Sequence, residues 1–149
     1  MMKKNILVIS LIFFLVNCGF TPIYLKNTDI NFSIEQVNYT GDKELNNFLK
    51  TNLDQYKNKK IDNKIYIQAD SIYKKIVLSK DGAGEVTNYQ LEAEVIFLIK
   101  PLSKRIKITE KKIMDSMDDK FEEARKERTI KQNFAYSISN KLSLELIIN

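Results

Sequence analysis

The chain has 149 residues, of which 44% are hydrophobic, and this suffices for the core of one folded domain. With no His and a single Cys, the sequence excludes Ser-His-Asp and Cys-His catalysis, and zinc sites built on imidazoles or thiolate clusters. Its 24 Lys and Arg and 19 Asp and Glu give a formal net charge of +5 with mixed sign along the chain, unlike the concentrated basic stripe typical of nucleic-acid binding.

The N-terminus has the pattern of a signal peptide. Lys3 and Lys4 precede an apolar run over residues 6–16 that only Ser10 interrupts. As a helix this run is roughly 16 Å long, about half the thickness of a hydrocarbon core, and so is too short to cross a membrane comfortably. The charged start and short apolar run therefore predict the hydrophobic region of a signal peptide, with a buried core helix as the alternative.

The only cysteine follows this run directly. The stretch LVNCG, residues 15–19, resembles a bacterial lipobox, although Asn17 stands where Gly, Ala or Ser is usual. The resemblance implies cleavage before Cys18, with diacylglycerol and an N-acyl chain on that residue, and several chains anchor a protein stably. Gly19, rather than Asp, after the cysteine implies the outer membrane, on its periplasmic side. A buried or free thiol is the alternative.

We therefore expect residues 1–17 to be the signal peptide, 18–28 the lipid anchor and tether, and 29–149 one domain. Side chains in residues 30–34 alternate between apolar and polar, which predicts a half-buried strand. Gly41-Asp42 ends that strand, and Asp42 suits a helix N-cap. Apolar residues then recur at helical spacing and predict an amphipathic helix: Leu45, Phe48, Leu49, Leu53 and Tyr56.

Three further strands and a second helix follow. A strand beginning at Ile65 changes its apolar parity near Asp70-Ser71, which predicts a β-bulge there. The stretch SKDGAG, residues 79–84, predicts a hairpin loop. Residues 89–99 alternate clearly and become apolar on both faces in their second half, so this strand is expected to be covered on both sides or to meet a partner. Pro101 ends it.

Residues 106–108 begin the fourth strand, and a long amphipathic helix starts near Asp118. Its expected apolar positions are Phe121, Ala124, Ile130, Phe134, Ile138 and Leu142. Because short turns join the last three strands, these must be antiparallel neighbours. We predict the α+β class: a two-layer sandwich of a mostly antiparallel four-stranded sheet with two helices on one face, in the order β-α-β-β-β-α.

Two short motifs in this order resemble one protein family. The stretch CGFTPIY, residues 18–24, is similar to the start of mature LptE-type lipopolysaccharide-assembly lipoproteins in their alphaproteobacterial form. The stretch TNYQL, residues 87–91, resembles the start of the corresponding strand in that family, where many relatives carry Arg at the position of Asn88. The order of elements agrees along the whole mature chain.

The resemblance implies a non-enzymatic protein that plugs an LptD-type outer-membrane β-barrel, assists its assembly and binds lipopolysaccharide in transit to the outer leaflet. It implies no cofactor or metal beyond the lipid on Cys18, and no nucleic-acid partner. Because lipid A carries phosphates, basic residues near strand ends are candidate contacts: Lys74, Lys75 and Lys80 at the hairpin, and Lys104 and Arg105 at the opposite turn.

Two alternatives remain open. For each of these basic residues the alternative is a solvated side chain of the kind that blunts a sheet edge. The chain is alternatively a generic periplasmic-facing lipoprotein that binds peptidoglycan or another envelope protein. A carboxylate-dependent hydrolase would need a converging acidic pair, and no such spacing stands out.

Overall fold

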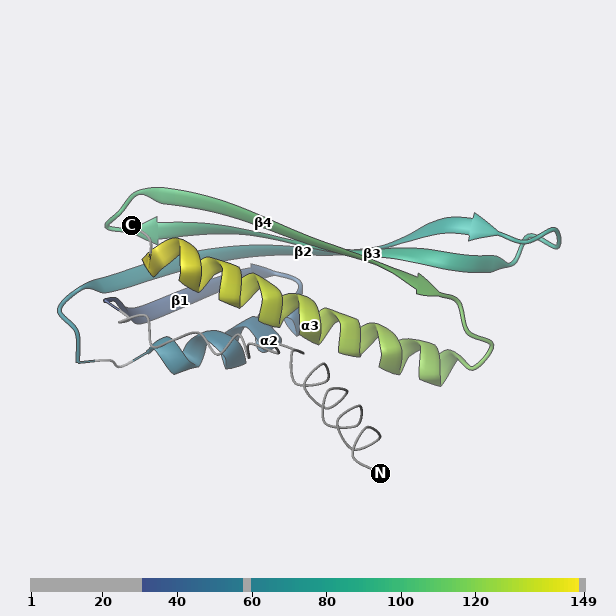
Figure 1. The fold of residues 1–149 in the computed structure, drawn as a ribbon, viewed down its shortest axis with the longest axis horizontal. Helices are drawn as coiled ribbons and strands as arrows, with labels where there is room; N and C mark the ends of the chain where they lie inside the picture. Colours follow the sequence, from purple (N-terminus) through teal and green to yellow (C-terminus); the bar gives the residue numbers. More distant parts are fainter. Residues whose placement is uncertain (1–30, 58–59, 148–149) are drawn as a thin grey trace, which may run out of the picture.

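The computed structural model describes residues 31–57 and 60–147, which form two layers (Figure 1). One layer is a four-stranded sheet and the other contains the helices. The elements run in the order β1 (Ser33–Gly41), α2 (Lys43–Leu53), a 3₁₀ turn η1 (Asp54–Tyr56), β2 (Lys64–Lys80), β3 (Val86–Lys100), β4 (Lys104–Asp115) and α3 (Lys120–Ile147).

The strands lie in the order β1-β2-β3-β4 across the sheet. β1 pairs with β2 in parallel, and the crossover between them contains α2, as a parallel connection requires. β2, β3 and β4 pair as antiparallel neighbours through short turns. The predicted fold class and element order are confirmed.

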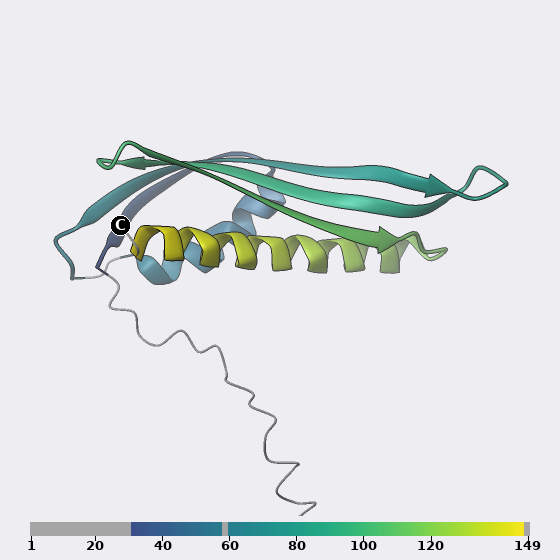
Figure 2. The ribbon, with the colours of Figure 1, turned by 45° about the horizontal axis from the view of Figure 1, so that its top comes forward.

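Both helices lie on one face of the sheet (Figure 1 and Figure 2). The core between the layers is formed by inward-facing strand residues and one face of each helix. Its largest fully buried side chains include Phe32, Ile34, Leu45, Leu49, Phe97 and Ile138. Among the described residues, no helix or strand covers the opposite face of the sheet. We call it the uncovered face.

The junction between β1 and α2 follows from two residues. Gly41 has a φ of +93°, and a Cβ there would lie 1.8 Å from the Ser71 carbonyl oxygen, so only glycine fits without distortion. The next residue, Asp42, accepts a hydrogen bond from the Leu45 backbone N–H at 2.7 Å. The predicted strand end and N-cap are therefore confirmed.

The predicted β-bulge near Asp70-Ser71 is wrong. β2 keeps one continuous register with β3 from Tyr66 to Val77, and the irregularities fall elsewhere, in β1 near Ile34 and close to the hairpin tip. Ser71 occupies a core position because its hydroxyl donates to the Thr40 carbonyl oxygen at 3.1 Å. The inward-facing residues of β2 are apolar up to Ala69, and the polar Ser71 then takes the next inward position. From the sequence this looks as if the apolar residues change to the other face of the strand. In the structure the strand keeps its faces, and Ile72 lies on the uncovered face.

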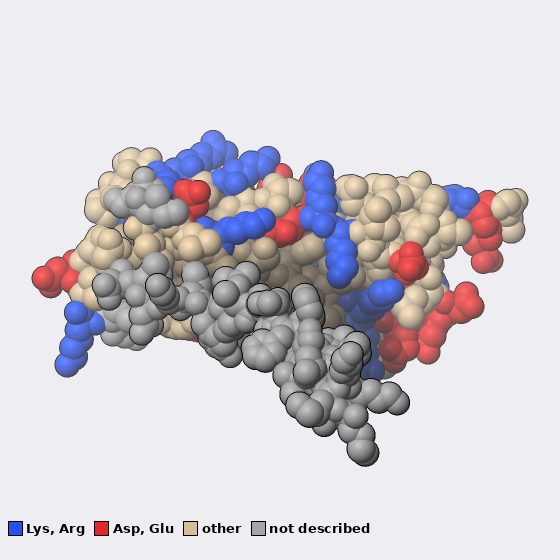
Figure 3. Space-filling model, viewed as in Figure 1, with Lys and Arg blue, Asp and Glu red and all other residues tan. Residues whose placement is uncertain are grey.

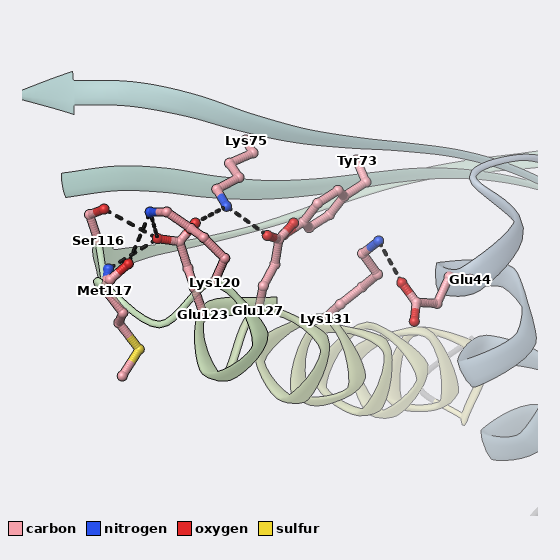
Figure 4. A network of polar contacts seen from close by, with 9 residues as sticks. All are labelled: Glu44, Tyr73, Lys75, Ser116, Met117, Lys120, Glu123, Glu127 and Lys131. Carbon is pink, nitrogen blue, oxygen red and sulfur yellow. Dashed lines mark hydrogen bonds and ion pairs between the residues drawn. The ribbon is translucent and has the colours of Figure 1, made fainter. Parts of the chain in front are cut away.

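The apolar face expected for α3 is correct only from Ile130 onward. Phe121 is 74% exposed and Ala124 also faces solvent. The first turns instead direct Glu123 and Glu127 toward β2, as Figure 4 shows. There the helix lies under a part of the sheet that presents polar side chains.

The β2–β3 hairpin is longer than the rest of the sheet. β1 ends opposite Ser71, so the remainder of β2, residues 72–80, has no neighbouring strand on that side within the described chain. Figure 1 and Figure 2 both show the hairpin tip projecting beyond the start of α3. The molecule thus has a helix-packed end and a projecting sheet end.

Candidate functional site

The hairpin tip is organised by Asp81. Its Oδ1 accepts hydrogen bonds from the backbone N–H groups of Ala83 and Glu85, both at 2.9 Å. Gly84 has a φ of +88°, which favours glycine. The predicted hairpin loop is confirmed, and it places Lys80 at the exposed end of β2.

Lys75 lies between the sheet and α3 (Figure 4). Its Nζ is 2.8 Å from Glu123 Oε1 and 2.9 Å from Glu127 Oε2, and it lies 4.2 Å from the ring centroid of Tyr89. Burial alone would lower the pKa of Lys75, but hydrogen bonds to the two carboxylates outweigh it and raise the pKa. This ammonium group is therefore committed to contacts within the molecule.

Glu123 connects that lysine to the turn before α3. Its Oε2 accepts hydrogen bonds from Ser116 Oγ at 3.2 Å, the Met117 backbone N–H at 3.0 Å and Lys120 Nζ at 3.2 Å. The hydrogen bond from Lys75 is the largest of the causes that lower the pKa of Glu123 to about 2. The carboxylate thus stays ionised and joins β2, the turn and α3.

A second group of contacts continues along α3. Lys131 donates to Glu44 Oε2 of α2 at 2.9 Å, and its Nζ lies 4.0 Å from the ring centroid of Tyr73. Tyr73 donates to Glu127 at 3.0 Å, and burial is the largest cause of the raised pKa of its phenol. These contacts link both helices to β2. Sequence reasoning missed them, although Glu123, Glu127 and Lys131 share one helical face.

The structure separates the predicted hairpin lysines. Lys74 lies on the uncovered face, opposite Glu92 in β3, whereas Lys75 points toward the helices. Glu92 is also 2.9 Å from Lys111 of β4, and this hydrogen bond is the main cause that lowers the pKa of the Glu92 carboxyl group. Lys80 is exposed at the tip, so the three lysines do not form one cluster.

The two basic residues at the opposite turn also face apart. Lys104 points to the helix side and donates to the Glu145 backbone carbonyl at 3.0 Å and to its carboxylate at 3.1 Å. Arg105 pairs in register with Leu98 and lies exposed on the uncovered face. Within the described chain Arg105 has no ion-pair partner.

Charge is distributed unevenly over the surface. Figure 3 shows Lys and Arg side chains along the edge where β4 lies, and Asp and Glu side chains toward the hairpin end. The hollow beside the tip, of about 740 Å³, has three carboxylates and one ammonium group in its lining: Asp81, Glu85, Asp118 and Lys120. Positive potential is therefore stronger along β4 than at the tip.

The Asn88 side chain in β3 bridges to both neighbouring strands. Its side chain accepts a hydrogen bond from Ser79 Oγ at 2.8 Å and donates to Asp115 Oδ1 at 2.7 Å. The residue in this position of TNYQL therefore has a local structural role.

Within the described ranges, no group of acidic or sulfur-containing side chains is arranged to hold a metal ion. Over the same residues, no helix has the length and apolar character that spanning a bilayer requires. Cys18 lies outside the described residues, as do the expected signal peptide and tether, so their assignment stays a prediction.

These observations define a class of protein: a small α+β domain with one helix-packed face and one uncovered sheet face. No protein-family model matches the chain, and no curated protein matches it. Solved structures do share its fold. Rare lipoprotein B from Shewanella oneidensis is 17% identical, with a TM-score of 0.55 over 74% of this chain and 92% of that one.

Two more lipoproteins give similar values. Lipoprotein B from Nitrosomonas europaea is 17% identical, with a TM-score of 0.53 over 76% of this chain and 83% of that one. A minor lipoprotein from Acinetobacter baumannii is 12% identical, with a TM-score of 0.51 over 74% of this chain and 94% of that one. The chain therefore has the LptE-type fold that its motifs led us to expect.

Proposed function

We propose that this protein is an LptE-like outer-membrane lipoprotein, of the alphaproteobacterial form, anchored through lipid on Cys18 on the periplasmic side. It assists assembly of an LptD-type β-barrel, plugs that barrel, and binds lipopolysaccharide during transport to the outer leaflet. The function is non-enzymatic, and it needs no cofactor besides the covalent lipid.

The observation that carries this proposal is the fold shared with rare lipoprotein B over nearly the whole length of that protein. The two sequence motifs support it independently, because one follows the apolar N-terminal run and the other begins β3. The uncovered face adds a physical reason. A plug must present a rigid surface with many polar groups to a polar barrel lumen, and the β3–β4 part of this face contributes the ion pairs Lys107–Glu94 and Lys111–Glu92.

The basic residues differ in how well they suit a phosphate group of lipopolysaccharide. Arg105 is exposed and without an acidic partner among the described residues, so its guanidinium is available for a bidentate contact. Lys74 and Lys80 are also exposed. Lys75 and Lys104 already bind carboxylates, so we expect them to contribute less.

The test is a mild-detergent pull-down of the C-terminally tagged full chain from outer membranes, with mass spectrometry of the eluate. A large β-barrel that co-elutes in comparable amount supports the proposal. An unrelated tagged outer-membrane lipoprotein is the control for carry-over in detergent. A lipidated chain that elutes alone, or with peptidoglycan enzymes, contradicts the transport assignment and favours the alternative of a generic envelope lipoprotein.

Lipopolysaccharide binding is measured separately, with purified chain and lipopolysaccharide in detergent. Arg105→Ala should weaken binding, whereas Lys112→Ala should not, because Lys112 is on the same strand but pairs in register with Leu91 on the helix side. Equal affinities for the two variants would count against Arg105 as a phosphate contact.

A further inference from the structure

The uncovered face of the sheet is hollowed at the end away from the hairpin tip. One hollow, of about 570 Å³, crosses all four strands, and its lining includes Asn38, Thr40, Gln68, Asp70, Leu98 and Arg105. A second hollow, of about 220 Å³, shares Asn38 and Gln68 with the first and adds Gln36, Tyr66 and Lys100. Because the two hollows share lining residues, they adjoin each other, and we call them together the sheet-face groove.

Strand register arranges the groove in rows. Asn38 of β1 pairs with Gln68 of β2, which pairs with Leu98 of β3 and then Arg105 of β4. The row beside it runs from Gln36 through Tyr66 to Lys100. Successive rows on one face are roughly 7 Å apart, and the side chains in them stand about perpendicular to the sheet. Extended β-structure thus holds these side chains at fixed spacing.

The polar groups of the groove suit a ligand with many hydroxyl groups. The side chains of Gln36, Asn38 and Gln68 each contain both donors and an acceptor, as a sugar hydroxyl does. Gln36 donates to Asn38 Oδ1 at 2.8 Å, which fixes the orientation of both amides. Thr40 donates to Asp70 Oδ1 at 2.8 Å, and the carboxylate keeps further lone pairs for a ligand hydroxyl.

Apolar surface lies among these polar groups. Tyr66 is 47% exposed and Leu98 is 41% exposed, although both are on a regular strand with no described element above them. An aromatic ring and an aliphatic side chain provide a platform for the C–H face of a sugar ring, and a phenol hydroxyl can hydrogen-bond to such a ligand.

The charge in the groove is unbalanced toward positive. Further along the same face, Lys107 is paired with Glu94 at 2.9 Å and Lys111 with Glu92 at 2.9 Å. In the described part of the chain, Arg105 and Lys100 have no such partner, and both line the groove. Asp70 is one row away from Arg105, and its carboxylate accepts a hydrogen bond from the Thr40 hydroxyl. The groove therefore favours an anionic group beside its hydroxyl-binding amides.

We infer that the sheet-face groove binds an anionic oligosaccharide, with Arg105 and Lys100 at its acidic group and the three amides at its hydroxyls. Under the proposed function, this saccharide is the core oligosaccharide of lipopolysaccharide. The inference rests on the proposed function only for this identification of the saccharide. Peptidoglycan fragments present the same chemistry, with carboxylates in place of phosphates.

The test is calorimetric titration of the purified, lipidated full chain in detergent with core oligosaccharide released from lipopolysaccharide, which contains no lipid A. Gln68→Ala should weaken binding about tenfold, and Arg105→Ala at least as much. Lys107→Ala is the matched control, because it removes a cation on the same face that is already neutralised by Glu94. Removing the phosphates from the oligosaccharide should abolish the difference between Arg105→Ala and wild type.

Soluble muropeptides are titrated in parallel. If only they bind, and Gln68→Ala weakens them while Lys107→Ala does not, the groove is supported and the lipopolysaccharide source is rejected. If neither sugar binds the wild type, or if all three variants bind like wild type, the inference is overturned. The barrel pull-down does not depend on these sugars, so failure of the groove and failure of the proposed function are distinguishable.

Discussion

At the scale of single residues, the most consequential group is Glu123. The residue is 5% exposed, and its carboxylate accepts hydrogen bonds from two lysines, a hydroxyl and a backbone N–H. Buried charges of this kind stabilise a fold only when all their partners are present. Its depressed pKa is therefore also a statement about stability.

Glu123→Gln should lower the free energy of unfolding by about 3 kcal/mol at pH 7, because the pKa falls from 4.5 to about 2 on folding. A depressed folded-state pKa gives stability that is present above pH 4.5 and is lost as the pH falls through about 2. The difference in the free energy of unfolding between wild type and variant should therefore decrease as the pH is lowered from 5 to 2. Urea unfolding followed by circular dichroism at several pH values measures it.

The control is Glu122→Gln, one residue earlier. Glu122 is 45% exposed at its side chain and has an ion pair with Arg125 within the same helix. Such pairs contribute about 0.5 kcal/mol or less. If both variants lose the same stability at pH 7, the role assigned to Glu123 is wrong.

Gly41 lies where the structure leaves no room for a Cβ. Gly41→Ala should cost about 3 kcal/mol, because the residue has a positive φ and the new methyl group would meet the Ser71 carbonyl oxygen. Gly82→Ala is the comparison, since nothing lies within 4 Å of a Cβ there. Thermal unfolding of both variants should show a clear loss for the first and a change near zero for the second.

Contacts between residues close together in the sequence could be predicted, whereas contacts between residues far apart could not. The N-cap at Asp42 was predictable, because its partner is three residues away. The partners of Lys75 were not, since Glu123 lies 48 residues further on and only tertiary packing brings them together. Nothing in the local sequence distinguishes Lys75, which binds two carboxylates of α3, from the other hairpin lysines.

At the scale of elements, the alternation of side chains predicted burial most reliably in β3. Phe97 is fully buried and Leu98, beside it, is 41% exposed. Phe97→Ala should cost about 3–5 kcal/mol, whereas Leu98→Ala should cost about 1 kcal/mol or less. Chemical denaturation compares the two directly, and similar losses would mean that the uncovered face is covered in the isolated protein.

The elements that sequence reasoning misjudged share a physical cause. In β2 a hydrogen-bonded serine occupies a core position, and in the first turns of α3 charged residues occupy the inward face. A hydrophobic pattern assumes that inward positions are apolar, and both exceptions are polar groups satisfied by distant partners. Where the inward positions are apolar, as in β3, the pattern was correct.

At the scale of the whole molecule, the order of elements and the short turns were enough to predict the layers. They were not enough to predict the groove, because its lining comes from all four strands and depends on their register. Arg105 was a candidate from its charge alone. Its neighbours Asn38 and Gln68 are ordinary polar residues in the sequence and acquire meaning only when β1 pairs with β2.

The anchor is the remaining whole-molecule prediction. Cys18→Ala should abolish lipidation and remove the protein from the outer-membrane fraction, because the acyl chains on Cys18 are its proposed anchor there. The domain should keep its thermal midpoint, since the proposed role of Cys18 is to carry lipid and not to pack in the core. Membrane fractionation, intact mass and thermal unfolding measure these three outcomes. Wild-type fractionation of Cys18→Ala in cells that lack the barrel would contradict the anchor, because partner binding could no longer hold the protein there.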